Sequence, residues 1–192
     1  MKRLQDFILE CLNEDAKPKQ SVNIIVGRFQ PFTLGHVACV KQAVKDVGEN
    51  TVLCVVDTTK ADDKHPFLTS EMTDILDKIV MYEKNVVGWV RVKNADIVKN
   101  AEILREAGYN PVSWSCGTDR YDSYSRMATK YADMAGLSED FKVIEVKRGD
   151  DDISATKVRT ALKEGDRKAF EASMPVYLHS SFDELKKMID KG

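Results

Sequence analysis

The sequence predicts an α/β protein with a Rossmann-like open parallel sheet of five strands and helices on both faces. Short apolar runs alternate with helical patterns along the chain, and this alternation is typical of right-handed βαβ units. The run Thr51–Asp57 is almost continuously apolar, as expected of a strand buried on both faces. Polar turns follow several of these runs, at the sheet edge where ligands of such folds bind.

Each predicted strand is a short apolar run between turn residues, and each predicted helix has apolar residues at three- and four-residue spacing. The predicted strands are residues 22–26, 51–57, 88–92, 111–116 and 141–146. The predicted helices are residues 3–14, 37–44, 69–84, 94–107, 121–135, 156–162 and 181–189. Gly108 and Gly165 stand where two of these helices should end. We therefore expect an N-terminal helix and connector over residues 1–19, and one domain over residues 20–192 that ends in a helix.

Composition and charge exclude several classes of protein. The chain has 192 residues, of which 43% are hydrophobic and 31% charged, and its formal net charge is -2. No global basic field points to nucleic acid, and no apolar run approaches the roughly 20 residues of a membrane span. The four cysteines are widely spaced without a signal for disulfides, and Cys54 and Cys116 lie in strand patterns as expected of buried thiols. We expect a cytoplasmic protein without a signal peptide.

The first motif runs from Gly27 to His36, between an apolar strand and a helical pattern. The free N–H groups and the dipole of a helix N-terminus favour an anion in such a turn. Thr33 and His36 are three residues apart around Gly35, so a hydroxyl and an imidazole can face the same ligand. This arrangement predicts a phosphate site.

The second motif is Ile153–Arg159, after the last predicted strand. Ser154 and Thr156 place hydroxyl groups at the start of the next helix, and Arg159 follows within one turn. The guanidinium of Arg159 can therefore reach the same anion as these hydroxyls. Asp150–Asp152 precede this motif, and an acidic turn before a helix is a better explanation of them than a metal site.

Together the two motifs resemble the H/T-x-G-H and I-S-S/G-T-x-x-R signatures of the nucleotidylyltransferase superfamily. The string from Gly27 to His36 is most similar to the nicotinamide-mononucleotide adenylyltransferase branch, many members of which have His in place of Thr33. The likeness covers most of residues 20–190 and extends to phage-encoded nucleotidyltransferases, which would place the protein in the host cytoplasm. Residues 1–10 are also similar to phage capsid-targeting leaders, but an ordinary docking helix is the favoured interpretation of them.

The resemblance implies a role for each motif residue. It implies that His36, Thr33 and Arg159 are catalytic and stabilise charge at the phosphates, and that Lys60 and Lys64 bind the acceptor. It further implies a nucleotide site made by Gly27, Arg28, Phe29, Gly35, Gly117, Asp119, Ser154 and Thr156. Mg²⁺ is expected on the nucleotide phosphates rather than in a dedicated metal cluster of the protein. Residues 64–72 resemble a K-x-P-F/M-x-T-x-E-R segment of adenylyltransferases, although Met72 replaces the arginine.

Several of these assignments have a structural alternative. Asp119 could cap the helix expected from Tyr121, and Lys60 and Lys64 could belong to a solvated loop. Trp114 reads as a core residue, although Trp114 or Tyr121 could also form a slot for a flat acceptor ring.

The expected activity is transfer of AMP from ATP to a phosphate-bearing acceptor such as nicotinamide mononucleotide. The alternatives are a cytidylyltransferase that acts on a phospho-alcohol and a non-catalytic nucleotide-binding phage protein. A homo-oligomer is compatible with the sequence.

Overall fold

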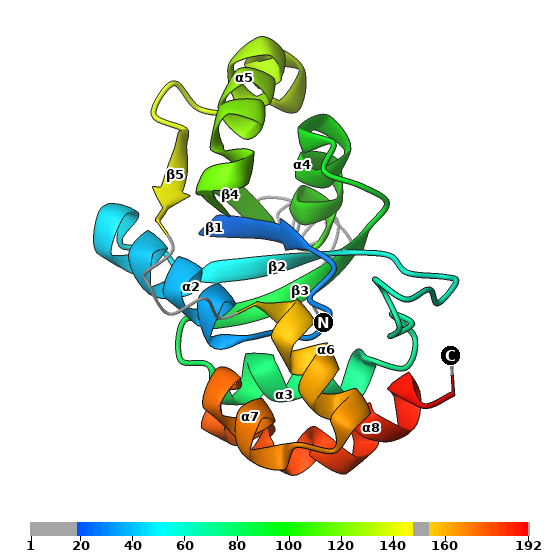
Figure 1. Cartoon of the computed structure of the whole chain (residues 1–192). Coiled ribbons are helices and arrows are strands. Elements are labelled where there is room, and N and C mark those ends of the chain that lie inside the picture. Colours follow the sequence, from blue (N-terminus) through cyan, green and yellow to red (C-terminus); the bar gives the residue numbers. More distant parts are fainter. Residues whose placement is uncertain (1–18, 148–153, 192) are drawn as a thin grey trace, which may run out of the picture.

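The computed structural model describes residues 19–147 and 154–191. Its centre is a parallel sheet in the order β3-β2-β1-β4-β5 (Figure 1). The strands are β1 (Gln20–Gly27), β2 (Thr51–Val56), β3 (Val86–Val92), β4 (Tyr109–Gly117) and β5 (Lys142–Val146). The chain first adds strands on one side of β1 and then on the other, so the switch point lies between β1 and β4. The predicted fold class is confirmed.

Helices cover both faces of this sheet. They are α2 (Leu34–Val47), α3 (Thr73–Tyr82), α4 (Ile97–Glu106), α5 (Thr118–Ala135), α6 (Ala155–Glu164), α7 (Arg167–Ser173), the 3₁₀ helix η1 (Val176–Ser181) and α8 (Phe182–Ile189). In Figure 1, α4 and α5 lie above the sheet, and α3, α6, α7 and α8 lie below it. Neighbouring residues of β1 enter different cores: Ile24 packs in the core under α4 and α5, and Ile25 in the core that includes α2 and α3.

Several helices begin at other residues than the sequence predicted, including α2 at Leu34 and α4 at Ile97, and the differences at α3 and α5 bear on the site. Helix α3 begins at Thr73 rather than near Thr69, because Thr69 closes the preceding loop. Its Oγ1 accepts a hydrogen bond from Thr58 N at 2.7 Å, and its N–H donates to Thr58 O at 3.0 Å. Helix α5 begins at Thr118 with Gly117 as its N-cap, so Asp119 lies in the first turn and does not cap the helix.

The C-terminal elements α7, η1 and α8 brace α6, the helix of the second motif. Leu162 of α6, Phe170 of α7 and Leu185 of α8 are fully buried in the same core. Lys78 of α3 donates a hydrogen bond to Ser181 Oγ at 3.2 Å and so ties this group to the rest of the core. The sequence predicted α8 but neither α7 nor η1.

Cys54 and Cys116 are buried thiols, as predicted. Burial raises the pKa of each thiol to about 12, because the thiolate would lose its hydration. The expected helix over residues 3–14, Ile153 and the acidic run 150–152 lie outside the described residues. No described helix combines the length and apolar character that a membrane span requires.

Candidate functional site

A cavity of about 1210 Å³ opens at the carboxyl ends of the strands, where the N-termini of α2, α5 and α6 meet. Its wall contains all of the site residues predicted from the sequence except Lys60, which is exposed on the loop after β2. The members of that set in the wall are Gly27, Arg28, Phe29, Thr33, Gly35, His36, Lys64, Gly117, Asp119, Ser154, Thr156 and Arg159. The fold therefore brings together residues that are more than 120 positions apart in the chain, such as Gly27 and Arg159.

The cavity wall is cationic although the chain as a whole has a formal net charge of -2. Its only aspartates among the described residues are Asp63 and Asp119. Its Lys and Arg side chains are Arg28, Lys64, Lys93, Arg120, Lys147, Arg159 and Lys163. Positive charges gathered in a concave site focus the field there and favour a polyanionic ligand.

His36 is fixed in the first turn of α2 by Thr33, the N-cap residue. The backbone N–H of Thr33 donates to His36 Nδ1 at 3.0 Å, and Thr33 Oγ1 lies 3.1 Å from the same atom. A backbone N–H can only donate, so Nδ1 is an acceptor and the proton of the neutral ring is on Nε2. Thr33 is 2% exposed, whereas His36 is half-buried.

Two phenyl rings hold the His36 imidazole in place. The ring of Phe32 stacks on it with centroids 5.2 Å apart, and Phe29 contacts it edge-on at 5.1 Å. Phe29 has a left-handed backbone with φ of 48°, and its ring lies beneath Gly27. A Cβ at Gly27 would lie 3.4 Å from this ring, at the short end of ordinary van der Waals contact. The turn therefore packs closely around the histidine.

The N-terminus of α6 supplies a second group of donors. Ser154 caps the helix, because its Oγ accepts a hydrogen bond from Lys157 N at 3.3 Å. Arg159 donates from Nη2 to Thr156 Oγ1 at 3.1 Å and from Nη1 to the carbonyl oxygen of Gln30 at 2.8 Å. Burial lowers the pKa of this guanidinium below its usual value, and the charge of Asp62 opposes the shift. Arg159 thus joins the second motif to the first.

The loop after β2 carries Lys64 into the cavity wall. Asp62 shapes its tip, because its Oδ1 accepts hydrogen bonds from Lys64 N at 2.8 Å and His65 N at 2.7 Å. These bonds, with that of His65 first, lower the pKa of the Asp62 carboxyl. Met72, which replaces the arginine of the adenylyltransferase segment, is 3% exposed in the core and cannot contact a ligand in its place.

Besides Phe29, the cavity wall contains an aromatic side chain that the sequence did not suggest for a ring slot. Trp114 is fully buried, as its reading as a core residue predicted, and Tyr121 does not line the cavity. Tyr124 lines it instead, with its ring stacked on Trp114 at a centroid distance of 3.9 Å. Sequence reasoning also missed Lys93, Lys147 and Lys163, because no motif surrounds them.

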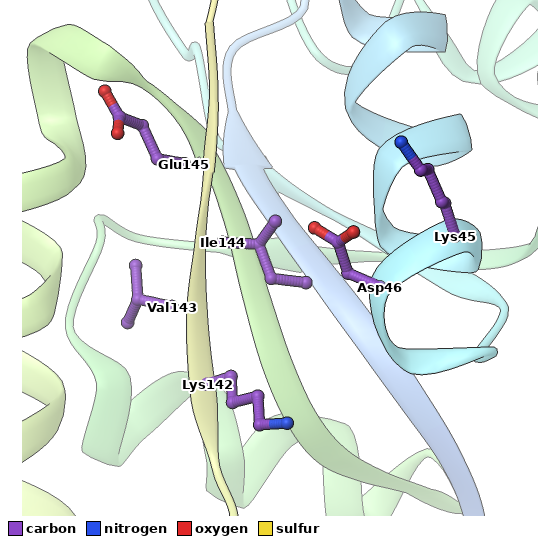
Figure 2. A pocket seen from close by; sticks show the side chains of 6 residues that line it. All are labelled: Lys45, Asp46, Lys142, Val143, Ile144 and Glu145. Atoms are coloured by element: carbon purple, nitrogen blue, oxygen red, sulfur yellow. The ribbon is translucent and has the colours of Figure 1, made fainter.

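A second hollow of about 630 Å³ lies between the C-terminal end of α2 and the edge strand β5 (Figure 2). Figure 2 shows Ile144 directed toward Asp46 of α2, with Val143 and Glu145 on the other side of β5. Its two lysines, Lys45 and Lys142, are matched by the carboxylates of Asp46 and Glu145. This balance distinguishes it from the cationic cavity, and none of the predicted site residues lies in it.

A parallel sheet with a cationic cavity at the carboxyl ends of its strands, and a phosphate motif on each of two helix N-termini, defines a nucleotidylyltransferase-like α/β protein. The chain belongs to the cytidylyltransferase-like family, whose family model matches residues 24–161. This range begins in β1 and ends in α6, so both motifs lie inside it. The superfamily expected from the sequence is confirmed. No curated protein matches the chain in sequence.

Solved structures of nucleotide-binding enzymes share the fold. The Thermotoga maritima protein TmcAL, bound with alpha-thio ATP, is 14% identical with a TM-score of 0.56, and 90% of this chain matches 56% of that one. A bifunctional NMN adenylyltransferase/ADP ribose pyrophosphatase from Francisella tularensis, complexed with AMP and a manganese ion, is 14% identical with a TM-score of 0.57 over 90% of this chain and 52% of that one. The chain thus spans about half the length of these two proteins.

A nicotinic acid mononucleotide adenylyltransferase from Plasmodium falciparum, complexed with APC, matches over 98% of its own length. It is 12% identical with a TM-score of 0.56 over 90% of this chain. At identities this low, the likeness establishes the fold but not the substrates of this chain.

Proposed function

We propose that the protein transfers AMP from ATP to the phosphate of nicotinamide mononucleotide and releases pyrophosphate. The observation that best supports this proposal is that both phosphate motifs meet in one cation-rich cavity, where Arg159 of the second contacts the carbonyl of Gln30 in the first at 2.8 Å. The cavity, at about 1210 Å³, exceeds the roughly 300–1,000 Å³ of sites for one small molecule. It has room for a nucleoside triphosphate and an acceptor together.

The reaction requires mainly alignment and stabilisation of charge. An oxygen of the acceptor phosphate is ionised near neutral pH and attacks the α-phosphorus without a general base. The bond from that phosphorus to the oxygen bridging to the β-phosphorus breaks, and pyrophosphate leaves with the electron pair. His36 would donate from Nε2 to an α-phosphate oxygen, and Thr33 would orient the ring through Nδ1.

The remaining wall residues would hold the two substrates. Ser154, Thr156 and Arg159 would bind the β- and γ-phosphates, since a guanidinium has five N–H donors and can keep its two protein contacts. Gly117 and Asp119 would hold the nucleotide ribose. On the acceptor side, Lys64 and the unpredicted Lys93 would supply positive charge, and exposed Lys60 would at most contribute from outside the wall.

Mg²⁺ is part of this proposal as a cofactor bound through the nucleotide phosphates. It would neutralise charge that develops on the phosphate oxygens. In nucleotide sites Mg²⁺ keeps several waters and binds through phosphates and one or two carboxylates. Asp63 is the carboxylate of the described cavity wall that is not assigned to the ribose, and it fits this pattern.

Chromatography of products tests the activity. Purified protein with ATP, Mg²⁺ and nicotinamide mononucleotide should form NAD and pyrophosphate in equal amounts, and neither should form without the acceptor. The same assay with each of four triphosphates and a panel of phosphorylated acceptors identifies the preferred pair. Pyrophosphate from CTP and a phospho-alcohol alone would make the protein a cytidylyltransferase. No pyrophosphate from any pair would contradict catalysis and favour a nucleotide-binding protein.

A further inference from the structure

Gln30 lies where the first phosphate motif meets the second motif and the loop after β2. It belongs to the turn before α2, and its side chain is 5% exposed. Its backbone carbonyl accepts the hydrogen bond from Arg159, whereas its side-chain amide points to a different part of the site, the loop over residues 58–69. A buried amide is costly unless its donors and acceptor are satisfied, so its partners show what it holds in place.

The amide of Gln30 pairs with both backbone groups of Phe67. Its Oε1 accepts from Phe67 N at 2.9 Å, and its Nε2 donates to Phe67 O at 2.7 Å, with Thr58 Oγ1 also 3.4 Å from Nε2. The ring of Phe67 is fully buried in the core. Gln30 therefore links the phosphate turn to a loop that begins 28 residues later.

The other hydrogen bonds of this loop, among the described residues, are local. Thr58 and Thr69 close its base through two hydrogen bonds of 2.7 and 3.0 Å, and Asp62 organises its tip. These hydrogen bonds shape the loop, and the Phe67 ring in the core and the attraction between Asp62 and Arg159 restrain it without hydrogen bonds to the phosphate turn. The Gln30 amide forms the hydrogen bonds that join the loop to the phosphate turn, through Phe67. Phe67 lies two residues after His65, which lines the cavity beside Lys64.

We propose that Gln30 is a positioning residue that orders the loop over residues 58–69 and presents Lys64 and His65 to the acceptor. The identity of the acceptor in this role rests on the proposed function, whereas the ordering of the loop by Gln30 is independent of that function. A loop that is already ordered spares the acceptor the entropy cost of ordering it, so the effect should fall on acceptor affinity. ATP contacts should change little, because the carbonyl that holds Arg159 belongs to the backbone and survives a substitution of the side chain.

Hydrogen–deuterium exchange tests the ordering without any substrate. In Gln30→Ala, the amides of residues 59–68 should exchange about tenfold faster than in the wild type, because the tether to Phe67 is lost. Gln42→Ala is the matched control, since the Gln42 amide binds Asp46 at 2.9 Å on an exposed face of α2. Unchanged exchange in Gln30→Ala would overturn the proposal whatever the enzyme activity. If this variant does not fold, Gln30→Asn and Gln30→Glu take its place in both measurements.

Kinetics test the consequence for the acceptor. In Gln30→Ala the KM for nicotinamide mononucleotide should rise about tenfold, and the KM for ATP should stay within about threefold of the wild type. Equal rises of both KM values, or none, would overturn the role. The variant Gln30→Glu can still accept from Phe67 N but donates to Phe67 O only when protonated. Its deficit relative to the wild type should therefore shrink as the pH is lowered, and a constant deficit would contradict the amide contact.

A wild-type protein that makes no NAD would contradict the proposed function before any variant is measured. The exchange experiment would then still decide whether Gln30 orders the loop. Failure of the two proposals is thus distinguishable.

Discussion

At the scale of single residues, the structure places Thr33 and His36 differently: Thr33 is buried, whereas His36 is half-buried and lines the cavity. The sequence placed both at the phosphates, but the Thr33 hydroxyl lies 3.1 Å from Nδ1 of the imidazole and is nearly inaccessible. The backbone N–H of Thr33 already fixes the tautomer of the imidazole, so removing the hydroxyl leaves that contact in place. We therefore propose that Thr33 acts mainly by orienting His36.

The corresponding prediction compares two substitutions in this pair. His36→Ala should lower kcat roughly a hundredfold, because a donor to the transferred phosphate is lost. Thr33→Val keeps the backbone N–H on Nδ1 and should cost about tenfold or less. His179→Ala is the control, since His179 of η1 contacts Met174 O at the end of α7 and does not line the cavity. Steady-state kinetics on variants with an unchanged circular dichroism spectrum decide this. Equal losses of kcat in His36→Ala and Thr33→Val would indicate that the Thr33 hydroxyl contacts the phosphate directly.

At the scale of secondary structure, each phosphate motif is also the start of a helix, so capping and ligand binding use the same groups. The N-cap Ser154 begins α6 at the cavity, and the N-cap Asp96 begins α4, where it accepts from Val98 N at 3.0 Å. Asp96 does not line the cavity. Comparing substitutions of these two caps therefore distinguishes an effect on helix stability from an effect on anion binding.

We expect Ser154→Ala and Asp96→Ala each to lower the free energy of unfolding by about 1 kcal/mol, since each removes a capping acceptor. Only Ser154→Ala should weaken ATP binding, because Ser154 lines the cavity and Asp96 does not. Denaturant titration measures the first effect and calorimetric titration with ATP the second. A loss of ATP affinity in Asp96→Ala would mean that helix stability alone accounts for the effect.

The elements also show how far the sequence could predict this molecule. The five strands and the order of the long helices follow from strong periodicity, and both motifs identified the cavity. The short α7 and η1 carry too few residues for a periodic signal. Lys93 was missed because its place at the cavity follows from strand order rather than from a local pattern.

At the scale of the whole molecule, charge is unevenly distributed. The chain has a formal net charge of -2, but cationic side chains dominate the wall of the large cavity. The acidic residues must therefore lie mostly elsewhere, and the second hollow illustrates the contrast with its balanced lysines and carboxylates. An anion is repelled weakly by the molecule as a whole and attracted locally by the cavity.

This distribution predicts that salt should weaken ATP binding and that the effect should come from the cavity. Lys163→Glu on α6 and Lys45→Glu in the second hollow change the net charge equally, but only Lys163 lines the cationic cavity. At low ionic strength Lys163→Glu should raise the Kd for ATP about tenfold, and Lys45→Glu should leave it within about twofold. The difference should fade as salt is raised, because screening reduces the field of exposed charges. Calorimetric titrations over a series of salt concentrations measure both variants. Equal effects of the two substitutions would show that net charge, and not the cavity, governs the attraction.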